Sequence, residues 1–318
     1  MGNIFTKDMW YSKDSKILII LCLLAVAPCR AQYHPQYSQY MFNGLALNPA
    51  YAGSQEVLSL TTLYRSSQLG NSIPGAPATY TFSGDFPLRN PQLALGLLVF
   101  DDVISIYRQT GAYFAYAFRV RAGEGKLSFG LQAGFDLQRE DGSRIDIFQK
   151  PDPLFDFERH NTFMPNVGVG AYYYTSNFFA GLSFPQFLAY SPNTANSYSG
   201  KLTFVNTMLY GGMIVPVNRD FKIKPSTLLQ YVGKGILFDL NCNFILLKDR
   251  LDLGISYRNN TTLVVMTQFR INSQLCLGYA YDHAFGIPSV INTSHEIMLR
   301  YDLKIKVKAA SPLYLNKN

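Results

Sequence analysis

The sequence predicts an all-β protein: a transmembrane antiparallel β-barrel of about 14 strands, with a short N-terminal segment. Three observations support this class. Apolar residues alternate with polar or small ones along most of the chain, the alternating segments are long, and every second link between them is short. Because successive strand side chains point to opposite faces, each segment has one apolar face and one polar face.

Residues 1–31 have the features of a signal peptide. A basic stretch precedes the apolar run 17–26, and the small residues Cys29 and Ala31 suit cleavage before Gln32. The apolar run is about ten residues, whereas a membrane-spanning helix needs about twenty. We therefore expect the chain to be exported.

The residues that follow exclude several classes of partner. The chain of 318 residues has a formal net charge of +7 with scattered charges, so nucleic acid is not an expected partner. Cys242 and Cys276 are the cysteines left after the leader, without the spacing of a zinc site, so no metal or cofactor is expected. Cys242 is in phase with apolar neighbours and Cys276 with polar or small ones. We therefore expect the two thiols to face lipid and lumen respectively.

The barrel is predicted to occupy residues 56–305, followed by a periplasmic tail at 306–318. Most of its segments are ten to sixteen residues long, whereas strands of soluble sheets have about five or six and tilted membrane strands about nine to eleven. The expected strands lie at 56–68, 78–88, 92–103, 110–121, 125–140, 166–175, 177–188, 202–217, 221–233, 236–247, 251–260, 261–271, 273–284 and 294–305.

The alternation alone leaves open a secreted β-sandwich, which would hide its apolar face inside, and a membrane barrel, which turns that face toward lipid. Burying ions in a sandwich core would cost on the order of several kcal/mol each unless they are paired. The same ions cost little in a water-filled lumen. The membrane barrel, with the lipid bilayer as partner, is therefore favoured. The ions of the polar face are Arg119, Asp136, Asp239, Arg258, Arg270, Asp282, Arg300 and Asp302.

The links indicate the orientation of the barrel. Long links are expected at 69–77, 141–165, 189–201 and 285–293, and short ones between the other strand pairs. Outer-membrane barrels have short periplasmic turns and longer outer loops. We therefore expect an integral barrel in the outer membrane of a Gram-negative bacterium.

Residues 32–55 form the N-terminal segment, which we call the lead-in. Tyr37, Tyr40, Met41 and Leu45 follow helical spacing, and the pair Asn48-Pro49 is expected to end the helix. One or two helical turns followed by an extended link are predicted. Two placements remain open: packing on the barrel rim, or insertion into the lumen mouth, where tyrosines and amides would meet polar wall groups.

Several stretches resemble the PorP/SprF family of Bacteroidetes. They are "QYSQYMFNGLALNPAYAG" (36–53), "LYRSSQ" (63–68), "GAPATYTFSGDFPL" (75–88), "LALGLLVFDDVIS" (93–105) and "HEIMLRYDL" (295–303). The resemblance covers essentially the whole mature chain. The motif residues that it marks as candidate partner contacts are Gln39, Tyr40, Met41, Phe42, Asn43, Asn48, Pro49, Ala50, Tyr51, Ala52, Gly53, Tyr64, Arg65, Gly75, Pro77 and Asp101.

The resemblance implies a non-enzymatic outer-membrane component of type IX secretion and gliding motility. Its implied partners are components of that machinery and a large secreted, adhesin-like surface protein, the cargo that it would help export or anchor. The alternative is a channel or transport barrel for small or apolar solutes, since barrels of this size can enclose a cavity.

An enzyme is a third class, and the sequence offers little for it. The sequence lacks HExxH, GxSxG and P-loop motifs. Ser294 with His295 or His283 could form a hydroxyl–imidazole pair only through proximity. The predicted outer loop at 144–161 mixes acids, bases and aromatic residues, and either contacts a partner or is a solvated loop.

Overall fold

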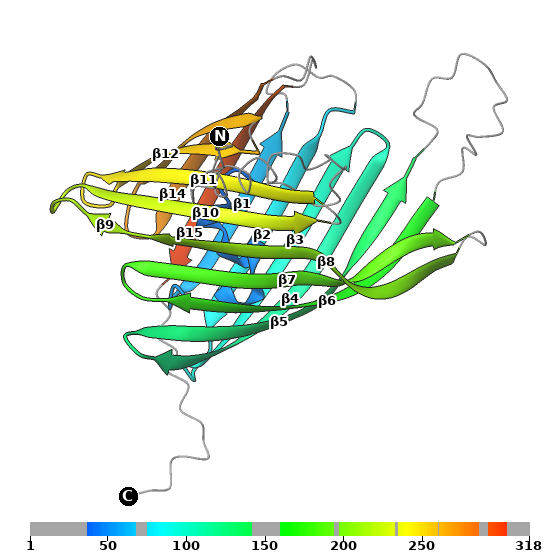
Figure 1. Ribbon diagram of the computed structural model, residues 1–318, viewed down its shortest axis with the longest axis horizontal. Helices are drawn as coiled ribbons and strands as arrows, with labels where there is room; N and C mark the ends of the chain where they lie inside the picture. The colour runs from blue at the N-terminus through cyan, green and yellow to red at the C-terminus, as the bar shows by residue number, and fades with distance from the viewer. Residues whose placement is uncertain are drawn as a thin grey trace, which may run out of the picture.

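The computed structural model describes residues 37–67, 75–141, 160–193, 197–232, 235–259, 261–285 and 292–303, with only the backbone described at 160, 189–193 and 197–205. The predicted signal peptide, the tail at 306–318 and most of the loop at 144–161 lie outside these residues. The described strands form a tilted ring around a central space (Figure 1).

The ring consists of long antiparallel strands joined to their sequence neighbours. In the part of the chain that the structure describes, fourteen long strands are present. They are β1 (Leu58–Ser66), β2 (Ala78–Pro87), β3 (Leu93–Ile104), β4 (Tyr107–Ala122), β5 (Gly125–Glu140), β6 (His160–Tyr174), β7 (Phe178–Asn193), β8 (Ser197–Met213), β10 (Lys222–Val232), β11 (Gly235–Leu246), β12 (Leu251–Arg258), β13 (Thr262–Arg270), β14 (Leu275–Ala284) and β15 (Thr293–Leu303).

The first and last strands pair with each other. β1 is hydrogen-bonded to β15 on one side and to β2 on the other, and the pairing of β10 with β11 completes the circle. The two-residue β9 (Val215–Pro216) continues the line of β8 and pairs with the start of β10. The predicted closed barrel of about 14 strands is therefore confirmed. Each long strand is thus paired on both sides over at least part of its length, as a closed barrel requires.

Two predicted links are partly strand. The link predicted at 189–201 is wrong, because β7 continues to Asn193 and β8 begins at Ser197, in register as a hairpin. This hairpin extends past its neighbours in Figure 1. β6 begins at His160, six residues earlier than expected, since residues 160–165 pair with the end of β5. In both places the hydrogen bonds between backbone groups of neighbouring strands continue past the residues whose apolar alternation was used for the prediction.

The two ends of the barrel differ in their connections. At one end, here called the turn end, β2–β3, β4–β5, β6–β7, β11–β12 and β13–β14 are joined by links of two to five residues. The opposite end, here called the loop end, carries the long links 67–77, 141–159 and 285–292. β3 and β4 are joined there by only Ser105 and Ile106, with Ser105 at φ +58°.

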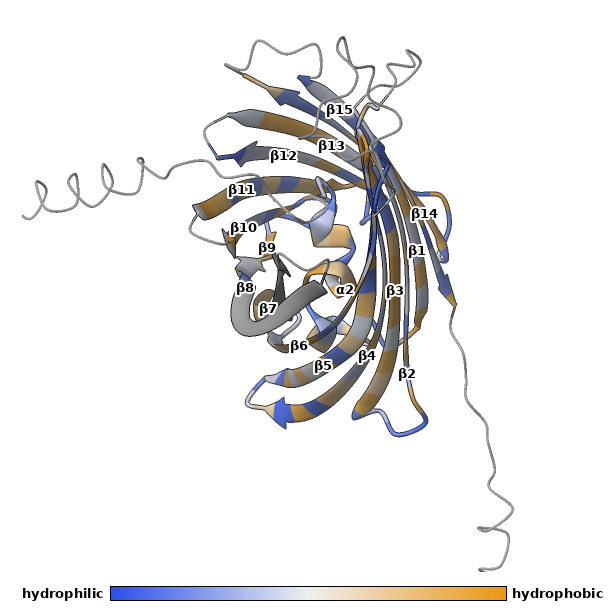
Figure 2. Ribbon diagram, turned by 90° about the vertical axis from the view of Figure 1, so that its right-hand side faces the viewer, coloured by the Kyte–Doolittle hydropathy of each residue, from blue (hydrophilic) through white to orange (hydrophobic). Residues whose placement is uncertain are grey.

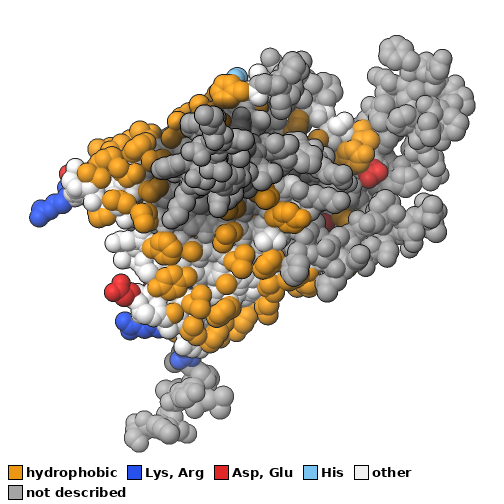
Figure 3. All heavy atoms as spheres, in the orientation of Figure 1, with side chains coloured by type: hydrophobic (Ala, Val, Ile, Leu, Met, Phe, Trp, Pro, Cys, Tyr) orange, Lys and Arg blue, Asp and Glu red, His pale blue; other side chains and the backbone are white. Residues whose placement is uncertain are grey.

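The outward face is apolar over the height of the wall. Phe114 is 70% exposed, Leu131 61% and Phe163 60%, and apolar side chains cover much of the described surface in Figure 3. Colour alternates along the strands in Figure 2. Such a band suits contact with lipid. Cys242 lies in phase with exposed Leu240 and Phe244, and Cys276 is buried, as expected from the sequence.

The lead-in lies inside the barrel, where α2 is enclosed by the strands (Figure 2). It forms the short helices η1 (Tyr40–Phe42), α2 (Gly44–Leu47) and η2 (Pro49–Tyr51). The predicted helical turns are therefore present, but the extended link predicted after Asn48 is wrong. Asn48 itself is extended, its side chain accepts a hydrogen bond from Ala50 N at 2.9 Å, and proline suits the first helical position. None of the described helices is long and apolar enough to span a membrane.

Candidate functional site

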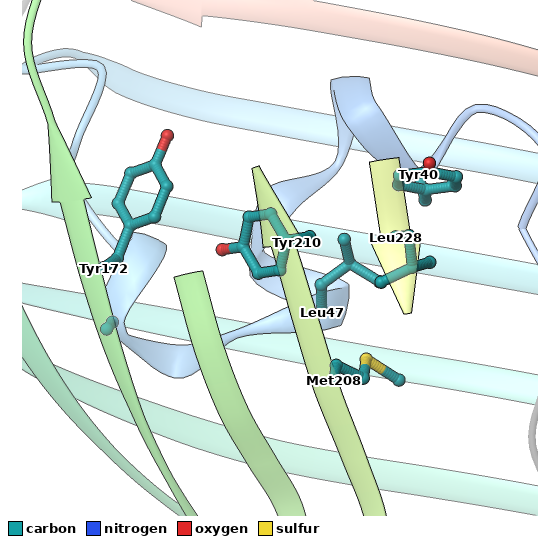
Figure 4. Packing of buried hydrophobic residues seen from close by; sticks show 7 residues of the cluster. Tyr40, Leu47, Tyr172, Met208, Tyr210 and Leu228 are labelled. Atoms are coloured by element: carbon teal, nitrogen blue, oxygen red, sulfur yellow. The ribbon is translucent and has the colours of Figure 1, made fainter. Parts of the chain in front are cut away.

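The candidate functional site is the interface between the lead-in and the inner wall of the barrel. Its largest apolar cluster joins one face of the lead-in to β6, β8 and β10 (Figure 4). The ring of Tyr51, next to this cluster, lies 5.6 Å from that of Tyr172. The buried members are Tyr40, Leu47, Ala50, Tyr172, Met208, Tyr210 and Leu228.

Two further apolar clusters hold other faces of the lead-in. Phe42 packs with Val264, Met266, Ala280 and Met298 of β13, β14 and β15. Leu45 and Ala52 pack with small alanines of β3 and β4. The inner wall is therefore apolar at these three clusters. This differs from the watery interior expected from the sequence, because the lead-in replaces water at this level.

Wall glycines allow the lead-in to lie against bare backbone. A Cβ at Gly130 would overlap the backbone of Ala50, and one at Gly170 would overlap the amide of Asn48. At Gly96 it would lie 2.9 Å from Leu45, too close for an ordinary contact. These glycines come from β3, β5 and β6, so one side of the wall is shaped to the lead-in.

Glu296 of β15 holds the start of the lead-in. Its two carboxylate oxygens accept hydrogen bonds from Ser38 N at 2.8 Å and Gln39 N at 2.7 Å, and its carbonyl accepts one from Gln39 Nε2 at 3.2 Å. All three residues are buried. Hydrogen bonds to an ionised acceptor are stronger than neutral ones, so this contact fixes the backbone of the segment.

Two arginines surround this contact. Arg65 of β1 lies 2.7 Å from Asp282 and 3.6 Å from Glu296, and donates to Ser38 Oγ at 2.5 Å. Arg258 of β12 lies 2.8 Å from Asp239, and donates to the carbonyl of Tyr37 at 3.0 Å. Pairing of this kind offsets the cost of burying the charges. The ions predicted for the inner face thus include anchors of the lead-in.

Asparagine amides secure the middle of the lead-in. Asn48 donates to the carbonyls of Ala171 at 3.0 Å and Leu182 at 3.3 Å. Ser83 of β2 donates to Asn43 Oδ1 at 2.9 Å. The amides therefore supply hydrogen bonds to several strands without adding charge to the lumen.

Gly53 marks the end of the docked segment. Its N–H donates to Asp85 of β2 at 2.6 Å, and its carbonyl accepts from the Arg119 guanidinium of β4. Its φ of +66° is in the left-handed region, and a Cβ there would lie 2.5 Å from Ala94 Cβ. Glycine is therefore required here by both backbone conformation and space.

The hydroxyls of Tyr37 and Tyr40 have hydrogen-bond partners on the wall. Thr81 donates to the Tyr37 hydroxyl at 3.1 Å, and the Asn241 amide donates to that of Tyr40. Burial raises the pKa of Tyr37, Tyr40 and Tyr51 above the usual tyrosine range. These groups are therefore neutral in the docked state.

The structure divides the sequence-predicted contact residues into two groups. The residues from Gln39 to Gly53 and the Arg65 guanidinium meet in the lumen, where most are buried. Tyr64 instead packs beside Tyr80 on the wall, with ring centroids 4.8 Å apart. Asp101 binds Arg108 at 2.9 Å near the loop end.

Gly75 and Pro77 belong to the link between β1 and β2. Gly75 accepts a hydrogen bond from Ser105 N at 3.0 Å, and the carbonyl of Pro77 accepts one from Ser67 N at 3.1 Å. These two residues therefore support the β3–β4 turn and the end of β1, outside the luminal interface.

Sequence reasoning missed the contact roles of Glu296, Asp85 and the wall glycines. Glu296 alternates with the apolar residues Ile297 and Leu299, which indicates an inward face but not a contact with the lead-in. The signal that could have found the glycines is their phase: Gly130 and Gly170 fall at inward positions of their strands, where the wall lacks side chains.

The hydroxyl and imidazole groups considered for an enzyme lie apart. Ser294 is buried and accepts a hydrogen bond from Arg65 at 2.8 Å. His295, the next residue, points to the other face and lies 2.7 Å from the Tyr279 hydroxyl. His283 is out of phase with inward Asp282 and packs against Phe285. The three residues do not meet at one site.

A small cavity remains on the loop-end side of the lead-in. It has a volume of about 60 Å³ and is lined by residues that include Tyr37, Leu47, Tyr113 and Gln186. This volume holds a few water molecules. Tyr113 and Gln186 both contact Asp136 there, at 2.7 and 3.2 Å.

Comparisons with known proteins identify a matching family. A family model described as type IX secretion system membrane protein PorP/SprF matches residues 29–301. No curated protein matches the sequence significantly.

Similar solved structures include outer membrane protein Omp33 of Acinetobacter baumannii, at 8% identity and a TM-score of 0.46, covering 77% of this chain and 96% of that one. The CymD monoaromatic hydrocarbon channel has 12% identity and a TM-score of 0.49, with 83% and 92% covered. A FadL homologue of Pseudomonas aeruginosa has 11% identity and a TM-score of 0.45, with 85% and 95% covered.

Proposed function

The chain belongs to the PorP/SprF family of type IX secretion system membrane proteins, and on that premise we propose that it is a non-enzymatic outer-membrane docking barrel. It helps export or anchor a secreted, adhesin-like surface protein through protein–protein contacts. Its leader directs export, its turn end faces the periplasm, and its loop end faces outward.

The observation that supports docking over transport is the filling of the lumen by the lead-in. Apolar clusters attach the lead-in to strands on several sides of the ring, and hydrogen bonds to Glu296, Arg65 and Arg258 hold its start. A solute path through this level would require the lead-in to leave, with the loss of these contacts. A barrel with a fixed plug offers its ends and loops to protein partners.

Deletion of residues 36–53 tests the proposal in cells. We expect the barrel to insert, shown by heat-dependent migration in gels, and display of the cargo on the cell surface to be lost. Replacing the same residues with a glycine-serine linker of equal length is the control for spacing and should give the same loss.

Two results would contradict the proposal. Unchanged display after the deletion would show that the lead-in is not needed for docking. Steady conductance of the intact purified barrel in planar bilayers, with dependence on small or apolar solutes, would instead favour the transport alternative.

A further inference from the structure

A second polar cavity opens at the turn end, below the docked lead-in. It has a volume of about 340 Å³, within the range of small ligand pockets. Its wall comes from the first residues of β10, β12 and β14 and the last residues of β13 and β15. Glu296, Arg65 and Gly53 do not line it, so it is separate from those anchoring contacts.

The cavity carries an excess of positive charge. Among its described lining residues are five cations and three carboxylates. Two cations are already paired: Lys222 lies 2.7 Å from Asp249, and Arg300 lies 2.9 Å from Asp302. The remaining cations are Lys224, Arg250 and Arg270, with the single carboxylate Asp252.

Two of these remaining cations are exposed to solvent. The side chains of Arg250 and Arg270 are exposed at the mouth of the cavity. Lys224 lies deeper, with its ammonium 4.9 Å from the centre of the Phe42 ring. Asp252 receives a hydrogen bond from Asn243 Nδ2 at 2.7 Å. The cavity therefore has room and an excess of positive charge for an added anion.

The lead-in gives the same cavity an apolar side. Met41, Phe42 and Tyr51 line it, together with Ile214 and Ile245 of the wall. A small inorganic anion would use the cations and leave these side chains without contact. A peptide with alternating acidic and apolar side chains would satisfy both parts.

We propose that this cavity is a binding site for an acidic peptide segment of a protein partner, entering from the turn end. Carboxylates of the segment pair with Lys224, Arg250 and Arg270, and its apolar side chains lie against Phe42 and Tyr51. This proposal depends only on the residues of the cavity. It does not depend on whether the barrel anchors a surface cargo.

Calorimetry on the full-length barrel in neutral detergent tests the site. The probes are a blocked hexapeptide of alternating aspartate and leucine, its asparagine counterpart, and inorganic phosphate. We expect the acidic peptide to bind at one per barrel, and binding to weaken as salt screens the charges. The asparagine peptide should bind at least about tenfold more weakly.

The variant Lys224→Gln with Arg270→Gln should weaken acidic-peptide binding by about tenfold or more. The matched control is Arg219→Gln with Lys248→Gln, which removes the same charge from exposed turn residues outside the cavity, and it should bind as the unaltered barrel does. Heat-dependent gel migration verifies that both variants are folded.

Three results would overturn the proposal: no binding of the acidic peptide, equal loss in both double variants, or binding of phosphate with none of the peptide. Because the readout is peptide binding by purified protein, failure here is separate from failure of cargo display.

Discussion

The side-chain amide of Asn48 occupies the space that a side chain at position 170 would fill. Gly170 leaves the wall of β6 bare, and Asn48 bonds from there to two strand carbonyls. A side chain of the lead-in thus fits into a gap in the barrel wall that exists because residue 170 has no side chain. Docking therefore depends on the shape of the wall as much as on the lead-in.

Gly170→Leu should displace the lead-in without unfolding the barrel. A leucine would overlap Asn48 and remove its hydrogen bonds, whereas the strand pairing of β6 uses backbone groups that remain. We expect protease cleavage within residues 37–53 to become rapid, while gel migration stays that of a folded barrel. Ala171→Leu is the control, because position 171 points to the other face of the same strand. Equal protease resistance in both variants would contradict the fit.

Gly53→Ala should destabilise the docked segment more than a glycine substitution that is strained by conformation alone. A residue with a Cβ at positive φ costs about 1 kcal/mol, and the overlap with Ala94 adds about 1 to 3 kcal/mol. Gly123→Ala is matched, since Gly123 has φ +59° and open space around it. Chemical unfolding monitored by tyrosine fluorescence measures the loss in the free energy of unfolding for each variant. Equal losses for the two variants would refute the steric overlap at Gly53.

Glu296→Gln should loosen the start of the lead-in. Losing the charge weakens hydrogen bonds worth about 1.5 to 3 kcal/mol to an ionised group, which corresponds to about tenfold or more in local opening. Amide hydrogen exchange at Ser38 and Gln39 should accelerate by that factor. Glu124→Gln, at an exposed turn, should leave these amides unchanged. Protection of Ser38 and Gln39 equal to that of the unaltered barrel would show that the carboxylate is not the anchor.

Docking should weaken at alkaline pH. Burial raises the pKa of Tyr37, Tyr40 and Tyr51 in the docked state, so the undocked segment loses protons first. The free energy that these three neutral hydroxyls contribute to docking is constant below the ordinary tyrosine pKa of about 10. It falls as pH rises above that value. Protease accessibility of the lead-in at pH 9 and pH 11 measures this.

Tyr40→Phe should reduce the alkaline sensitivity, because it removes one of the three ionising groups. Tyr257→Phe, on the exposed outward face, is the control and should leave the sensitivity unchanged. An accessibility that is flat between the two pH values would contradict the assignment of buried neutral hydroxyls.

The sequence by itself determined the wall. Strand alternation has a period of two, so residues such as Phe129, Leu131 and Phe135 had to share one face and Ser128 and Gln132 the other. Segment length and short turns then sufficed to predict the strand number, because both are local properties. The ends of β6, β7 and β8 were not predicted, since pairing beyond the membrane carries no apolar pattern.

Only the tertiary structure decided what fills the lumen. Whether the lead-in packs on the rim or inside depends on how residues far apart in the chain meet, as Ser38 and Glu296 do across 258 positions. Closure of the ring brings those distant groups together. Strand alternation shows which side chains point inward, but not which part of the lead-in each of them will contact. The same closure makes inward methionines and glycines of the wall into partners of the lead-in, because the space inside a ring is shared by all of its strands.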